Sequence, residues 1–149
     1  MIHYRNKTRK SGIDPRELKR TARAILDFLG EPDASLSVLV VDDSQIRELN
    51  RAHRGKDRST DVLSFPLAAA VDPRGGERLL GDVVISVETA RRQAADYDAT
   101  LEAELKRLLV HGVLHVLGHD HEQAGERKRM RAEERRVAAA IGMEWPYPG

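Results

Sequence analysis

The run from His111 to His121 reads HGVLHVLGHDH and constrains the fold more than any other part of the chain. His111 and His115 are four residues apart, so a helix stacks their imidazoles on one face, one turn from each other. Gly118 accepts the positive φ at which a helix ends and the chain reverses. The sequence therefore predicts a helix that stops before Gly118 and a return of the chain that carries His121 toward the pair.

Three imidazoles that meet in this way form a typical metal site. Three neutral His ligands with an open fourth position are typical of catalytic zinc, whereas structural zinc usually has four protein ligands. The chain has no cysteine, so a metal must rely on His and carboxylate. His111, His115 and His121 are the predicted ligands of one Zn²⁺ ion. His119 replaces His121 if the helix continues, and Asp120 is either an orienting carboxylate or a plain turn residue.

The composition is that of a globular protein without membrane or secretion signals. Hydrophobic residues make up 40% and charged residues 33% of 149 residues, which predicts a single domain over residues 1–149. No apolar run approaches the length of a membrane span, and no apolar segment follows the basic N-terminus. The absence of cysteine fits a reducing compartment, so we expect a cytoplasmic protein.

Basic residues gather in two clusters, although the net charge is only +1. The first cluster lies between His3 and Arg23, and the second between Arg51 and Arg58. Such clusters are usually solvated faces, but they are also compatible with a polyanionic substrate. Aromatic residues make up only 4% of the chain, which argues against a base-stacking module of the RRM type. We therefore expect phosphate contacts to dominate any binding of nucleic acid.

Periodicity and capping residues predict eight elements. Asp14 and Pro15 begin a helix that ends near Gly30, and Glu17 is expected to complete a capping box with Asp14. The other expected elements are strands at 36–41, 62–65 and 79–87, helices at 44–52, 88–97, 101–117 and 123–141, and a hairpin loop at 66–78. The order α-β-α-β-β-α-α-α predicts an α+β fold, with a small, mostly mixed β-sheet covered by about five helices.

The spacing of the histidines matches that of the metzincin proteases, in which Glu follows the first His. Gly112 stands in place of that Glu, the general base of those enzymes, which contributes about 10²–10⁴-fold to the rate. A peptidase is therefore the weaker hypothesis. A phosphodiester substrate instead requires a cation beside its non-bridging oxygens, for which the planar fork of arginine is suited. The segment 49–66 can supply that arginine.

Three blocks, in order along the chain, resemble the YbeY family of bacterial endoribonucleases. They are LNRAHRGKDRSTDVLSFP at 49–66, LGDVVIS at 80–86 and the His111–His121 run, within a likeness from about Leu36 to Ile141. The resemblance implies a single-domain α+β metal-dependent hydrolase that cleaves single-stranded RNA. It implies a role in rRNA processing (16S rRNA 3′ end maturation) and in ribosome quality control. The expected partners are rRNA, the small ribosomal subunit and ribosome-associated proteins, with neither DNA nor a membrane.

The resemblance also assigns roles to individual residues. His111, His115 and His121 would be the zinc ligands, and Arg54 the catalytic arginine that contacts the phosphate. His119 stands where many family members carry Tyr, which leaves the ligand assignment intact.

The leading hypothesis is thus a zinc-dependent endoribonuclease in which Arg54 stabilises charge that develops on the phosphate. Its general base is His119, Asp120 or a metal hydroxide acting alone. Two alternatives are a metzincin-like metallopeptidase and a non-catalytic ribosome-assembly factor with a structural metal. The basic clusters fit the assembly factor equally well.

Overall fold

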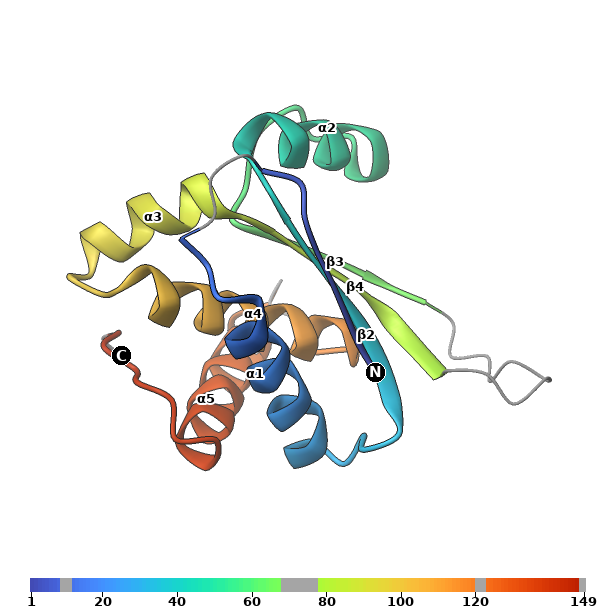
Figure 1. Ribbon diagram of the computed structural model, residues 1–149, viewed down its shortest axis with the longest axis vertical. Helices are drawn as coiled ribbons and strands as arrows, with labels where there is room; N and C mark the ends of the chain where they lie inside the picture. The colour runs from blue at the N-terminus through green and yellow to red at the C-terminus, as the bar shows by residue number, and fades with distance from the viewer. Residues whose placement is uncertain (9–11, 68–77, 120–122, 148–149) are drawn as a thin grey trace.

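The computed structural model describes residues 1–8, 12–67, 78–119 and 123–147. Within them, four strands form one sheet and five helices pack around it (Figure 1). The elements are, in chain order, β1 (Ile2–Asn6), α1 (Pro15–Phe28), β2 (Ala34–Val41), α2 (Asp43–Arg54), β3 (Val62–Pro66), β4 (Arg78–Ser86), α3 (Val87–Asp96), α4 (Leu101–Val116) and α5 (Ala124–Ala140). The predicted α+β class and the five helices are confirmed.

The sheet is mixed, with the strand order β1-β2-β4-β3. Strands β1, β2 and β4 run parallel, and β3 pairs antiparallel with β4, so that Leu63 lies opposite Val84. The predicted hairpin between β3 and β4 is confirmed, although residues 68–77 of its loop lie outside the described residues. Strand β3 therefore forms one edge of the sheet.

The predicted order of elements was wrong at its start, because it lacked β1. This strand pairs with β2, with Tyr4 opposite Val38. Its five residues alternate Ile2 and Tyr4 with His3 and Arg5. This alternation is too short to predict a strand, because the surrounding segment is basic and resembles a solvated arm. Its structure depends instead on pairing with β2.

Helices cover both faces of the sheet, but the core on one face is larger than the core on the other. Along β4, Val83 and Ile85 face the larger core, which α1, α3, α4 and α5 complete, whereas Val84 faces the smaller core. Helix α2 covers that second face with Ile46 and Leu49 (Figure 1). This alternation follows from the two-residue period of a strand. None of the described helices is long and apolar enough to cross a membrane.

Helix α4 is the centre of the larger layer, because it packs against β3, β4, α1, α3 and α5. Its polar residues Glu104, Arg107, His111 and His115 follow one another at intervals of three or four and therefore form one stripe. This α4 stripe carries two of the predicted metal ligands.

The start of α1 was predicted correctly except for one residue. Asp14 caps the helix by accepting a hydrogen bond of 3.0 Å from the backbone N–H of Arg16. Glu17 does not complete a capping box; its Oε1 accepts a hydrogen bond of 3.0 Å from Nζ of Lys106 on α4. The carboxylate of Glu17 therefore pairs with Lys106 of the neighbouring helix, and not with the backbone N–H of Asp14 as the capping-box motif predicts.

Candidate metal centre and active site

Helix α4 ends as the sequence predicts. Its last residue is Val116, and Gly118 has a φ of +98°. The backbone N–H of His119 donates to the carbonyl oxygen of Leu114 at 3.0 Å, which reverses the chain. His119 is therefore not one helical turn beyond His115, and the condition under which it would replace His121 as a ligand is not met.

His111 and His115 lie side by side at the end of the α4 stripe. Their ring centroids are 4.8 Å apart, with an angle of 60° between the ring planes. The third predicted ligand, His121, and its neighbour Asp120 lie outside the described residues. The described residues alone contain no group of three potential ligands, so the three-histidine site stays a prediction.

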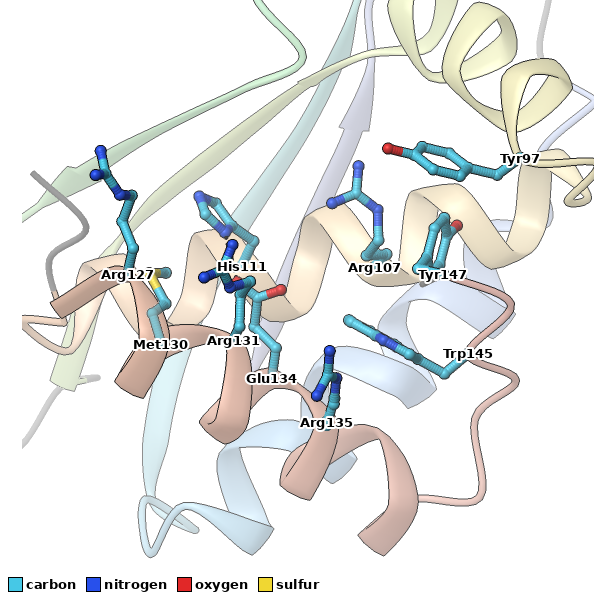
Figure 2. Close-up of a pocket in the computed structure, with 10 residues that line it drawn as sticks. All are labelled: Tyr97, Arg107, His111, Arg127, Met130, Arg131, Glu134, Arg135, Trp145 and Tyr147. Carbon is cyan, nitrogen blue, oxygen red and sulfur yellow. Dashed lines mark hydrogen bonds and ion pairs between the residues drawn. The ribbon is translucent and has the colours of Figure 1, made fainter. Parts of the chain in front are cut away.

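A buried carboxylate orients the first of these rings. Nδ1 of His111 lies 2.9 Å from Oε1 of Glu134 on α5, and Glu134 is only 5% exposed (Figure 2). Because a carboxylate only accepts hydrogen bonds, the neutral ring carries its proton on Nδ1 and keeps a lone pair on Nε2. A carboxylate behind a histidine in this way is the usual support of a metal ligand.

Gly112 has a structural reason for replacing the metzincin Glu. A Cβ at this position would lie 2.6 Å from Cγ1 of Val83 on β4, so α4 approaches the sheet too closely for any side chain. The carbonyl oxygen of Gly112 also accepts a hydrogen bond of 3.0 Å from Oγ of Ser64 on β3. A general base therefore cannot come from this position, and the peptidase mechanism loses its proton acceptor.

Arg54 is the last residue of α2, and the turn that follows it is firmly built. Gly55 ends the helix with a φ of +67°. Asn50, which is buried, accepts a hydrogen bond on its backbone oxygen from the N–H of Lys56, and its Nδ2 donates to the backbone oxygen of Arg58 at 2.9 Å. The loop after Arg54 is thus fixed from within α2.

Three cations at this end of α2 remain available to a ligand. Arg54, Lys56 and Arg58 are exposed and make no ion pair with any residue that the structure describes. The neighbouring acids are paired elsewhere, Glu48 with Arg51 and Asp57 with Arg47. The hydrogen bond from Arg47 holds the pKa of Asp57 below its ordinary value, so this carboxylate remains ionised near neutral pH.

Arg54 and the two histidines approach the same edge of the sheet from opposite faces. The ring of His53 on α2 contacts the ring of Phe65 on β3 at 5.1 Å, while Ser64 on the same strand bonds to Gly112 on α4. A substrate phosphate that touches both groups must therefore cross the edge formed by β3.

This geometry gathers the three sequence blocks at one place: the end of α2 with β3, strand β4, and the end of α4. The sequence profile of the family described as endoribonuclease YbeY matches residues 3–142. The chain belongs to the endoribonuclease YbeY family. The family resemblance inferred from the three blocks is confirmed.

Individual relatives within the family differ in length. An endoribonuclease YbeY of Anaeromyxobacter sp. (strain Fw109-5) is 50% identical over 128 residues, which cover 86% of this chain and 65% of that protein. The protein of the same name from Syntrophotalea carbinolica is 42% identical over 147 residues, with 97% and 98% covered. A solution structure from Thermotoga maritima matches with a TM-score of 0.62 and 27% identity, over 95% of this chain and 90% of that one.

Glu134 is the site residue that sequence reasoning missed. It lies in a helix in which charged residues dominate, and nothing in its immediate sequence separates it from Glu133. The available signal was its place on the apolar side of the helix, four residues after Met130 and three before Val137, both buried.

Proposed function

We propose that this chain is a zinc-dependent endoribonuclease that hydrolyses single-stranded RNA. His111, His115 and His121 hold one Zn²⁺ ion, and Arg54 contacts the scissile phosphate. The observation that carries this proposal is the support of His111 by buried Glu134, beside His115, in a chain of an endoribonuclease family.

The residues present fit such an ion. Imidazole ligands suit zinc, and because Glu134 engages Nδ1 of His111, Nε2 is the nitrogen through which this ring would coordinate. When bound, the ion supplies Lewis-acid chemistry and a nucleophilic water at neutral pH. Glu134 keeps the ring of His111 in one tautomer and one orientation, and it excludes rotation of the ring away from the site.

The cations at the end of α2 bind and orient the RNA. Arg54 places a planar guanidinium at the non-bridging oxygens, where negative charge increases during hydrolysis. Lys56 and Arg58, on the loop that Asn50 fixes, contact neighbouring phosphates. Because these side chains lie across β3 from the histidines, the strand edge aligns the phosphate between them.

The described part of the chain excludes one position as the source of the general base. Gly112 excludes one from α4 at that position. His119 lines a second surface depression, which shares only Met130 with the described residues of the groove at His111. The proposed proton acceptor is His119, Asp120 or a metal hydroxide.

The proposed biological substrate is ribosomal RNA, with maturation of the 16S 3′ end and ribosome quality control as the processes. The small ribosomal subunit and its associated proteins are the proposed partners, DNA and membranes are not, and the proposed location is the cytoplasm, where ribosomes are made. The basic residues at the end of α2 and the family assignment support this proposal.

The test is cleavage of a labelled single-stranded RNA by metal-loaded wild type and by His115→Ala, purified in parallel. We expect cleavage by the wild type alone, since contaminating ribonuclease would appear in both preparations. Equal activity of the two proteins would overturn the proposal. Digestion of casein by the wild type, without cleavage of RNA, would favour a peptidase. Binding to the small subunit by both proteins, again without cleavage, would favour an assembly factor.

A further inference from the structure

A groove of about 350 Å³ includes His111 and extends between α4, α5 and the C-terminal tail (Figure 2). The α4 stripe lines one wall with Arg107 and His111. The other lining residues come from the end of α3, from α5 and from the tail: Tyr97, Arg127, Met130, Arg131, Glu134, Arg135, Trp145 and Tyr147. The groove thus shares His111 and Glu134 with the candidate active site and extends beyond it.

Glu134 in the wall and Glu104 behind it are both already engaged. Glu134 holds His111, as described above. Glu104 is fully buried, and its two oxygens accept hydrogen bonds of 2.7 Å from Nε and a terminal nitrogen of Arg107. The hydroxyl of Tyr147 donates to Glu104 at the same distance. These acids therefore stabilise the wall and do not oppose an anionic ligand.

The cations of α5 are in the opposite situation. Arg127, Arg131 and Arg135 are exposed, and in the described part of the chain none of them forms an ion pair. They are four residues apart, so they form a row along one face of the helix at intervals of about 6 Å (Figure 2). By contrast, Arg136 on another face of α5 pairs with Glu133. The row presents three unneutralised guanidinium groups to whatever occupies the groove.

The far end of the groove is aromatic. Tyr147 is fixed by Glu104 and by Arg107, whose guanidinium lies 4.8 Å from the centre of its ring. Tyr97 and Trp145 each meet Tyr147 edge to face, with centroids 5.2 Å apart. Figure 2 shows Trp145 reaching into the groove toward Arg135. The chain has six aromatic residues (two Phe, one Trp and three Tyr), and the fold places three of them in this groove.

We infer that this groove binds single-stranded RNA beside the scissile phosphate, with phosphates on Arg131 and Arg135 and a base stacked on Trp145. The inference rests on the proposed function, since it extends the substrate of the same site. A row of unpaired cations that leads to an aromatic face is the combination by which proteins hold single strands without reading their sequence. The row spans about 12 Å, the length of three to four stacked nucleotides. An aromatic content of 4% argues against a base-stacking module of the RRM type, but a single stacked base at Trp145 is compatible with it.

The test is the affinity of full-length, metal-loaded protein for a labelled 12-nucleotide single-stranded RNA, measured by stopped-flow anisotropy before cleavage occurs. The Arg131→Ala/Arg135→Ala double variant should bind more weakly. Its slope of log affinity against log salt should be shallower by about 1.4, the value for two lost phosphate contacts. Trp145→Ala should lose about tenfold in affinity, and Trp145→Phe should recover most of it, because phenylalanine retains a stacking face. Thermal melting of each variant checks its fold.

The matched control is Arg129→Ala, which removes the same charge from another face of α5, outside the groove. It should keep the affinity and the salt slope of the wild type. Groove variants that bind RNA as the control does would overturn the inference. RNA cleavage products are measured in the same samples, so that a failure of the groove inference can be distinguished from a failure of the proposed function. If the wild type cleaves RNA and the groove variants bind RNA as tightly as the wild type, only the groove inference is refuted. If the groove variants bind RNA more weakly but the wild type does not cleave it, only the proposed nuclease function is refuted.

Discussion

Nδ1 of His111 on α4 lies 2.9 Å from Oε1 of Glu134 on α5, and this contact joins the packing of two helices to the candidate metal centre. Glu134 is buried among the apolar residues of α5, so its position is set by the core rather than by solvent. The ring of His115 is 4.8 Å away, and its place follows from the same helix. The orientation of the two rings is therefore a property of the fold, present before a metal binds.

Replacing Glu134 should weaken metal binding without removing a ligand. Glu134→Gln keeps the size of the side chain but loses the negative charge behind His111, so we expect metal affinity to fall about 10- to 100-fold. Competition with a chromophoric chelator measures this affinity. Glu133→Gln is the control, since Glu133 pairs with Arg136 instead. Equal affinities of the two variants would contradict a supporting role for Glu134.

Arg54→Ala should separate catalysis from metal binding. Because Arg54 is exposed and unpaired among the described residues, its loss should change stability by no more than about 0.5 kcal/mol. The rate of RNA cleavage should fall about 10²–10³-fold, the cost of losing one group that stabilises transition-state charge. Initial rates, metal content and melting temperature are the measurements. Arg51→Ala, which breaks only the exposed pair with Glu48, should remain active; a metal-replete, fully active Arg54→Ala protein would refute this role.

Gly112→Ala should destabilise the protein even though alanine favours helices. The propensity gain is about 1 kcal/mol, but a Cβ placed 2.6 Å from Cγ1 of buried Val83 costs about 1–3 kcal/mol. Chemical denaturation should show a net loss of about 1 kcal/mol, partly restored by adding Val83→Ala. The control is Gly125→Ala in α5, where the nearest neighbour of the new Cβ is the end of a flexible side chain, Arg129, at 3.8 Å. A Gly112→Ala variant as stable as this control would show that α4 can move away from the sheet.

The sequence was sufficient for those parts of the fold that depend on local signals. The end of α4 was predicted because Gly118 alone suits the reversal, and the β3–β4 hairpin because Pro and Gly separate two apolar runs. Strand β1 was missed because its structure depends on pairing with β2, which no local pattern reveals. The sequence predicted a capping box for Glu17 because its actual partner, Lys106, is 89 residues away in the chain and no local pattern indicates their contact.

The same distinction applies to the site. His111 and His115 were recognisable because one helical turn brings them together, whereas Glu134 meets His111 only through the packing of α5 on α4. The sequence gives no role to Trp145 and Tyr147, since their contacts with Tyr97 and Arg107 depend on tertiary packing. His121 and Arg54 remain predictions for experiment.

Tyr147 should ionise unusually late. Burial and the hydrogen bond to Glu104 raise the pKa of Tyr147 above its ordinary value of about 10. Because the folded-state pKa is the higher one, docking of the tail is at full strength below pH 10 and weakens as pH rises through the raised pKa. Alkaline titration of tyrosinate absorbance in wild type and Tyr147→Phe isolates this group. The part of the wild-type titration curve that is absent from Tyr147→Phe belongs to Tyr147. If that part titrates at or below pH 10, Tyr147 is not held by Glu104.

The most direct test of the account is a titration of metal-stripped protein with Zn²⁺, followed by cleavage of a labelled single-stranded RNA. We predict that activity rises in proportion to added metal and saturates at one equivalent in the wild type, and that His115→Ala shows no saturable recovery. The ion would then belong to the site at His111 and His115 that Glu134 supports. RNA cleavage that is complete without metal, or that recovers equally in His115→Ala, would contradict the assignment of the chemistry to this site.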